Sequence, residues 1–120
     1  MLSDVERWWN KAKKDLGTAE YLFNGKRYED ASFFCQQSAE KALKAVLLKK
    51  KGKIIKIHDL VILAKHVQLD PALTKDCARL TFVYVDTRYP DTGTGRYTTT
   101  EVQADIESCR RILQWAEKNI

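Results

Sequence analysis

The chain has 120 residues and a formal net charge of +5, with 44% hydrophobic and 31% charged residues. This length and balance predict one globular domain over residues 1–120 and exclude a multidomain or disordered chain. Three widely spaced cysteines indicate free thiols in a reducing compartment rather than a disulfide framework. The first residues carry no apolar run typical of a leader, and the longest apolar stretch, residues 60–64, is too short to span a bilayer. We therefore expect a cytoplasmic protein with no membrane segment.

The excess positive charge is concentrated in one segment. Seven of the 21 basic residues and none of the 16 acidic residues lie between Lys41 and Lys56, so the rest of the chain is slightly acidic. Such a segment attracts phosphate, nucleic acid or an acidic protein. The alternative is a solvated helix end, where lysines complement the helix dipole.

Helical periodicity dominates the first half of the chain. Ser3 and Glu6 form a capping box, and apolar residues then recur at three- and four-residue steps as far as Phe23. An Asn-Gly pair ends this helix. A second helix is expected over about Tyr28 to Lys51, and it is apolar around most of its circumference. We therefore place the second helix in the middle of a bundle.

The second half predicts one short helix and two longer ones. Asp59 lies near the start of the short helix, and Pro71 lies in the first turn of the next. The sequence VYVDTRYP is assigned to the end of that helix and the following loop, because nothing else could pair with it as a strand. Thr98 and Glu101 form a second capping box before the last helix. The predicted fold is all-α: an up-and-down four-helix bundle with an additional short helix.

Asp15 interrupts the apolar stripe of the first helix. A buried carboxylate needs a hydrogen-bond donor or a cation. Lys41 and Lys44 are the nearest candidates once the first two helices pack antiparallel. We therefore assign Asp15, Lys41 and Lys44 a structural role rather than a catalytic one.

No metal site and no cofactor are expected. His58 and His66 are separated too widely to form a ligand pair, and each cysteine lies on the apolar stripe of a different helix. A nucleophilic Cys–His pair stays open, although burial would raise the thiol pKa and suppress its reactivity.

Residues 87–97, TRYPDTGTGRY, form an extended irregular segment that leads into a helix N-terminus. Arg88 and Arg96 can pair with phosphate, and Tyr89 and Tyr97 can stack against a base. The glycines allow close approach of the backbone, and the helix contributes its positive end. The segment is a candidate phosphate-binding site; the alternative is a flexible loop that ends in a helix cap.

Two sequence blocks, QQSAEKALKA and DTRYPD, resemble the HEPN family, the higher eukaryotes and prokaryotes nucleotide-binding domains. KAKKDLGTAEYL and IHDLVILA extend the similarity over nearly the whole chain. The resemblance implies an up-and-down helical bundle, usually a homodimer. For small stand-alone members it also implies a minimal nucleotidyltransferase as partner in a toxin–antitoxin pair.

The resemblance also bears on catalysis. Many HEPN proteins are metal-independent ribonucleases that carry Arg, four to six residues, then His, often with Tyr two residues later. Arg88 matches the arginine, but glycine or threonine occupies positions 93–95 and no histidine follows His66. Tyr97 lies where the tyrosine would fall if Gly95 aligns with the histidine. Because glycine cannot move a proton, we expect a nucleotide- or RNA-binding, or nucleotidyltransferase-binding, protein that is not an enzyme.

Two other functions stay open. One is a ribonuclease that uses Arg88 with another base, such as Tyr97 or His58 of a second subunit. The other is a helical interaction module whose lysines bind an acidic protein. A homodimer is also predicted from aromatic residues that exceed what a thin four-helix core hides: Trp8, Trp9, Phe33, Phe34, Tyr84 and Trp115.

Overall fold

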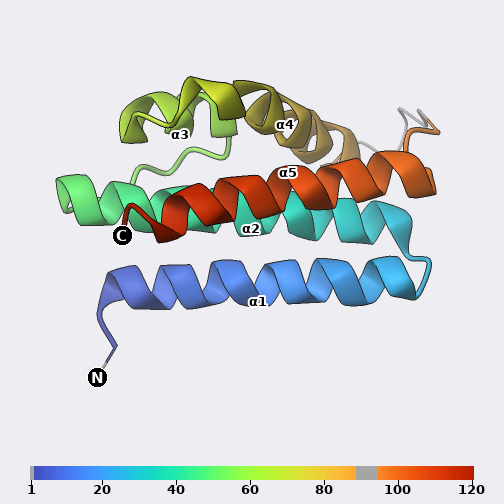
Figure 1. Cartoon of the computed structure of the whole chain (residues 1–120), viewed down its shortest axis with the longest axis horizontal. Helices are drawn as coiled ribbons and strands as arrows, with labels where there is room; N and C mark the ends of the chain where they lie inside the picture. Colours follow the sequence, from blue (N-terminus) through green and yellow to red (C-terminus); the bar gives the residue numbers. More distant parts are fainter. Residues whose placement is uncertain (1, 89–94) are drawn as a thin grey trace.

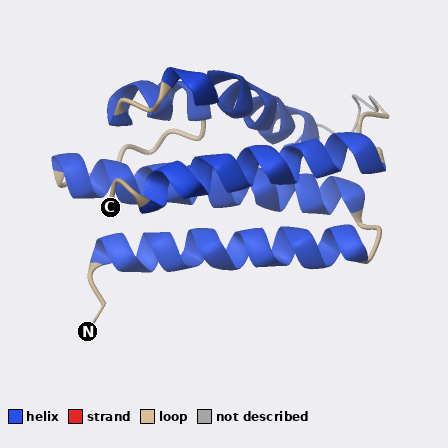
Figure 2. Ribbon diagram, viewed as in Figure 1, coloured by secondary structure: helices blue, strands red, loops and turns tan. Residues whose placement is uncertain are grey.

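The computed structural model describes residues 2–88 and 95–120 (Figure 1). Within these ranges the chain forms helices joined by loops and no strand, which confirms the all-α prediction (Figure 2). The elements are α1 (Asp4–Asn24), α2 (Tyr28–Lys51), α3 (Leu60–Val67), the 3₁₀ turn η1 (Pro71–Leu73), α4 (Thr74–Arg88) and α5 (Thr99–Glu117).

The four long helices alternate in direction along the chain, as in an up-and-down bundle (Figure 1). Helix α2 contacts each of the other α-helices, so its predicted central position is confirmed. The short helix α3 packs between α2 and α4. Large side chains fill the centre of the bundle without exposure, among them Leu43, Leu47, Leu63, Leu80 and Ile112.

Helix α1 packs closely on α2 through small residues. Ala12 and Ala19 of α1 and Ala39 and Ala42 of α2 have no exposed surface. Ser38 donates a hydrogen bond from its hydroxyl to the carbonyl oxygen of Ala12, at 2.6 Å. A side-chain bond to a backbone carbonyl of the facing helix requires such a close approach.

Asp15 makes the second polar link between α1 and α2. Its side chain is only 2% exposed, and its carboxylate lies 2.5 Å from Lys41 Nζ and 3.3 Å from Lys11 Nζ. Lys44, the other expected partner, instead lies 2.9 Å from Glu40, one turn earlier on its own helix. Lys44 therefore belongs to a different polar group, described below.

The helix termini follow the local sequence closely. Ser3 and Glu6 form the reciprocal capping box that the sequence predicts. Thr98 accepts a hydrogen bond from the backbone N–H of Glu101 at 3.2 Å. However, the Glu101 carboxylate pairs with Arg79 of α4 at 2.8 Å. The second capping box is thus half formed, because a tertiary ion pair takes the carboxylate that would complete it.

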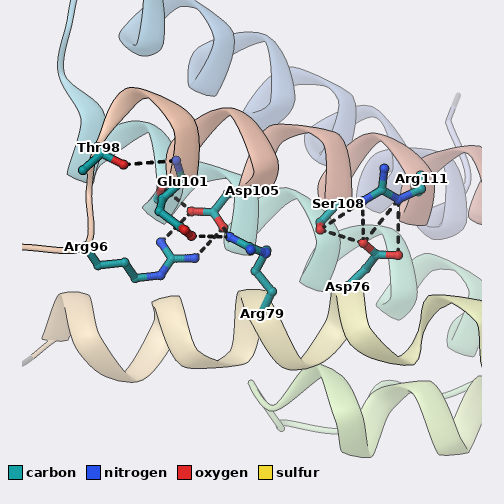
Figure 3. Close-up of polar contacts among 9 residues, drawn as sticks. Asp76, Arg79, Arg96, Thr98, Glu101, Asp105, Ser108 and Arg111 are labelled. Carbon is teal, nitrogen blue, oxygen red and sulfur yellow. Dashed lines mark hydrogen bonds and ion pairs between the residues drawn. The ribbon is translucent and has the colours of Figure 1, made fainter. Parts of the chain in front are cut away.

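Helices α4 and α5 are held together by buried carboxylates (Figure 3). Asp76 of α4 accepts hydrogen bonds from Ser108 at 2.6 Å and Arg111 at 2.8 Å. Asp105 lies closer to the N-terminus of α5 and accepts a hydrogen bond from Arg79 of α4 at 3.2 Å. These links hold the first half of α4 against α5.

Three further sequence expectations concern burial and composition. Cys35, Cys77 and Cys109 are free and buried. Among the described residues, no group of His, Cys, Asp and Glu side chains is arranged to hold a metal ion. In the same part of the chain, no helix has the length and apolar character needed to cross a membrane.

Candidate functional site

The structure gives Arg88 different surroundings from Arg96 and Tyr97, three of the four residues expected to bind phosphate. Arg88 is exposed at the last position of α4. Arg96 and Tyr97 lie just before α5 and are engaged with carboxylates of the same chain. Tyr89 lies outside the described residues, as do Gly93 and Thr94.

Arg96 forms a bidentate ion pair with Asp105 (Figure 3). Its two terminal nitrogens lie 2.7 Å and 2.6 Å from the two carboxylate oxygens, and its side chain is only 14% exposed. The hydrogen bond to Asp105 raises the pKa of Arg96 and outweighs burial, which lowers it. The contacts of Arg96 therefore favour a role in anchoring the segment before α5.

Asp105 is a structural residue near the site that was not predicted from the sequence. It has no exposed surface, and it also accepts hydrogen bonds from Ser32 of α2 at 2.6 Å and Arg79 of α4 at 3.2 Å. The available signal was its position between Val102 and Cys109 on the apolar stripe of α5. The same reasoning that singled out Asp15 applies to this carboxylate.

Tyr97 donates a hydrogen bond from its hydroxyl to Asp86 at 2.6 Å. Burial, together with this bond and the Asp86 charge, raises the pKa of Tyr97 well above its ordinary value. A phenol held in its neutral form is a poor proton acceptor, so this geometry disfavours Tyr97 as the base of a ribonuclease. Gly95 has φ 65°, a left-handed conformation that favours glycine over histidine at the aligned motif position.

Arg88 lies beside an aromatic stack. Its guanidinium carbon is 4.7 Å from the centroid of the Tyr84 ring, within the range of a cation–π interaction. The Tyr84 ring in turn stacks on His58, with centroids 5.1 Å apart and an interplanar angle of 20°. Helix α4 thus brings Arg88 and Tyr84, one turn apart, to the loop that precedes α3.

His58 is held by a buried carboxylate of α2. Its Nδ1 lies 3.1 Å from both oxygens of Glu40, while 52% of the His58 side chain stays exposed. Because Nδ1 faces Glu40, Nε2 is the nitrogen that can contact a ligand. We call Glu40, His58, Tyr84 and Arg88 the Arg88 cluster.

Glu40 is itself fixed on several sides. Gln36 and Lys44 donate to its two carboxylate oxygens at 3.0 Å and 2.9 Å, and Gln36 also donates to the backbone oxygen of His58 at 3.3 Å. Burial opposes ionisation, but the hydrogen bonds from Lys44, Gln36 and His58 lower the pKa of Glu40 overall. The carboxylate is therefore charged at neutral pH and orients the imidazole.

The HEPN domain profile matches residues 5–119 of the sequence. The chain belongs to the HEPN domain family. Its fold is similar to the crystal structure of TT1696 from Thermus thermophilus, with a TM-score of 0.90 and 26% identity over 99% of this chain and 100% of that chain. ST0689, an archaeal HEPN homologue, gives a TM-score of 0.79 and 30% identity over 98% of each chain. No curated protein sequence matches.

This HEPN domain thus combines an exposed cation, a pair of stacked rings and an imidazole oriented by a carboxylate. HEPN domains are generally related to nucleotides and RNA. In the sequence, the histidines were weighed as weak metal ligands and as partners of a nucleophilic cysteine, and His58 as a base from a second subunit. No sequence signal connected Glu40 with His58. In the structure, His58 and Arg88 of the same chain both contact the ring of Tyr84.

Proposed function

We propose that this HEPN protein binds a phosphate-bearing ligand, a nucleotide or RNA, at the Arg88 cluster and does not cleave it. The observation that carries the proposal is the exposed Arg88 guanidinium against the Tyr84–His58 stack. Guanidinium groups pair with phosphate through two parallel hydrogen bonds, and flat side chains supply stacking surfaces for bases. The absence of a histidine at the aligned motif position supports binding without turnover.

Arg96 and Tyr97 support this site indirectly. Arg96 pairs with Asp105 of α5, and Tyr97 bonds to Asp86 in the last turns of α4, so the two residues hold the segment before α5 against these helices. In this proposal they are positioning residues, whereas Arg88 contacts the phosphate.

The test is a titration of labelled oligouridine followed by fluorescence anisotropy, with a nucleotide titration in parallel. We expect Arg88→Ala to weaken binding by about tenfold or more. Arg88→Lys recovers only part of the affinity, because an ammonium group lacks the planar pair of donors. Equal affinities for Arg88→Ala and wild type would contradict the proposal.

Lys53→Ala is the control for loss of one charge. Lys53 is exposed within the lysine-rich segment, so its single charge is screened by salt. Lys50 is less suitable, because its ammonium donates to the carbonyl oxygen of Val67 at 2.8 Å and lies over the Trp115 ring. Lys53→Ala should bind within about twofold of wild type.

The same proposal includes a cytoplasmic homodimer paired with a minimal nucleotidyltransferase, as in a toxin–antitoxin system. Free buried cysteines support a reducing compartment, and exposed Phe82 and Val85 on α4 supply apolar surface for an interface. Light scattering that gives a monomer mass at micromolar concentration would contradict the dimer.

A second candidate function is metal-independent RNA cleavage, and the Glu40–His58 pair favours it. An imidazole oriented by a carboxylate can take the proton of a ribose 2′-hydroxyl while Arg88 stabilises the phosphate. Incubation of labelled RNA with wild type in the presence of a chelator decides between the two functions. Cleavage that is lost in His58→Ala and Arg88→Ala would establish the enzyme, whereas no cleavage above background supports binding alone.

A further inference from the structure

A cleft lies between α1 and α2, apart from the Arg88 cluster. It has a volume of about 260 Å³ and is lined by Arg7, Trp8, Lys11 and Lys41. The Trp8 side chain is half-buried and offers an aromatic wall, and the three basic side chains contribute their aliphatic stems and cationic ends. We call this feature the Trp8 cleft.

The charges around the Trp8 cleft leave an excess of cations. Lys11 and Lys41 share a single buried carboxylate, that of Asp15. Among the described residues, Arg7 forms its ion pair with Asp4, and the two side chains are 57% and 72% exposed. An exposed pair of this kind contributes little and exchanges readily with another anion. The Trp8 cleft is therefore suited to a flat aromatic group that is linked to an anion such as a phosphate.

Helix α2 connects the Trp8 cleft to the Arg88 cluster. The ammonium of Lys44 lies 5.8 Å from the centroid of a Trp8 ring and 2.9 Å from Glu40. Lys44 and Glu40 are one turn apart on the same face of α2. Glu40 in turn holds His58. Trp8 and His58 therefore lie along one face of the central helix.

We propose that the Trp8 cleft is a second base-binding subsite, which holds a base of a single RNA strand that also contacts the Arg88 cluster. This inference rests on the proposed function. Stacking on an indole accepts any base, and the residues that line the cleft offer cations rather than groups arranged to read the edge of a base. The subsite is thus sequence-tolerant, and its basic side chains contact the strand backbone.

An RNA strand is a better ligand for the Trp8 cleft than a free nucleotide, because each contact in the cleft is weak by itself. The cations of the Trp8 cleft are already shared with carboxylates, so a mononucleotide gains little there. A strand held at the Arg88 cluster has a high effective concentration at the Trp8 cleft, which makes a weak second contact useful.

The experiment compares uridine oligomers of about ten nucleotides with a dinucleotide and with uridine monophosphate, by anisotropy or competition. Trp8→Ala should weaken binding of the long oligomer about tenfold and leave the dinucleotide unchanged. The exposed Tyr21 of the same helix lies outside the cleft lining, so Tyr21→Ala serves as the aromatic control.

A second variant keeps the test valid if Trp8→Ala disturbs folding. Arg7→Ala removes one basic residue of the cleft without touching the core and should weaken the long oligomer severalfold. Arg27→Ala is its matched control, because Arg27 forms the same kind of exposed pair, with Asp30, at 2.8 Å. This pair lies at the start of α2.

The outcomes separate this inference from the proposed function. Loss of binding in Arg88→Ala, with wild-type affinity in Trp8→Ala and Arg7→Ala, would overturn the subsite and leave the Arg88 site intact. If wild type binds uridine monophosphate as tightly as the long oligomer, the inference that the ligand is an RNA strand is wrong. Wild type that binds none of the probes would overturn both proposals.

Discussion

Arg96 and Asp105 form a two-point ion pair at the N-terminus of α5, with nitrogen–oxygen distances of 2.7 Å and 2.6 Å. Both side chains are buried or nearly so, at 14% and 0% exposure. Because of this pair, Arg96 anchors the segment before α5 to the helix. The pair also leaves Arg88, eight residues earlier, as the cation of the segment that faces solvent among its described residues.

Removing Asp105 is expected to destabilise the protein strongly. Asp105→Ala removes the carboxylate that pairs with both terminal nitrogens of the largely buried Arg96 and that accepts hydrogen bonds from Ser32 and Arg79. We expect the free energy of unfolding to fall by about 3–5 kcal/mol, measured by urea denaturation. Glu107→Ala, which removes a half-exposed carboxylate of the same helix, should change it by about 0.5 kcal/mol or less. Equal stability of the two variants would refute the structural role of Asp105.

Asp15 provides a parallel test between α1 and α2. Asp15→Ala leaves the partly buried Lys41 ammonium without its carboxylate, and we expect a loss of about 1–3 kcal/mol in unfolding free energy. Lys11→Ala removes only the half-exposed partner and should cost about 0.5 kcal/mol or less. Thermal or urea unfolding of both variants checks the difference. If Asp15→Ala is as stable as Lys11→Ala, Asp15 does not anchor α1.

Glu40 is expected to make stability depend on pH in the acid range. Its pKa is lowered in the folded state from an ordinary value of 4.5, because hydrogen bonds from Lys44, Gln36 and His58 outweigh the opposing effect of burial. The resulting stabilisation is present above the unfolded pKa and is lost as the pH falls through the folded pKa. Wild type should therefore lose more stability than Glu40→Gln between pH 7 and about pH 3.

Urea unfolding at the two pH values measures this difference. The exposed Glu117 supplies the control variant, Glu117→Gln, which should follow wild type. A Glu40→Gln variant that loses as much stability on acidification as wild type would show that Glu40 does not contribute to the acid response.

The cysteines are expected to be unreactive in the native protein. Burial raises the pKa of Cys77 to about 12. A hydrogen bond with Cys109, together with burial, raises the pKa of Cys35 well above its ordinary value. A thiol reagent at pH 8 should therefore react slowly with the folded chain and label all three thiols after unfolding in guanidinium chloride. Rapid labelling of one thiol in the native state would contradict this expectation and favour the Cys–His nucleophile.

Local sequence signals were enough to predict the α-helices and their order. Ser3 and Glu6 cap α1 through bonds between neighbouring residues, and the bounds of α2, Tyr28–Lys51, agree with the prediction. Periodicity, caps and proline positions are local properties, so they can be read without knowledge of the fold. The family resemblance, which rests on short blocks such as QQSAEKALKA, was likewise available from the sequence.

The pairing of polar side chains from different helices could not be predicted from the sequence, because it depends on how the helices pack. Arg96-Tyr97 looked equivalent to Arg88-Tyr89 in the sequence, because both are an arginine followed by a tyrosine. Only the packing of α4 against α5 shows that Asp105 and Asp86 engage Arg96 and Tyr97. In the packed bundle, Lys44 pairs with Glu40 and Lys41 pairs with Asp15. In the sequence, both lysines were plausible partners of Asp15.

The Arg88 cluster depended on tertiary structure for the same reason. Glu40, His58 and Tyr84 come from α2, a loop and α4, and their contacts join residues that are far apart in the chain. Local patterns report which residues share a helix face, whereas the pairing of faces follows from how the whole core packs. A site assembled from three such segments is therefore fixed by the packing of the bundle. The sequence indicated Arg88, and His58 as a possible base from a second subunit, but it did not place them in one site with Glu40 and Tyr84.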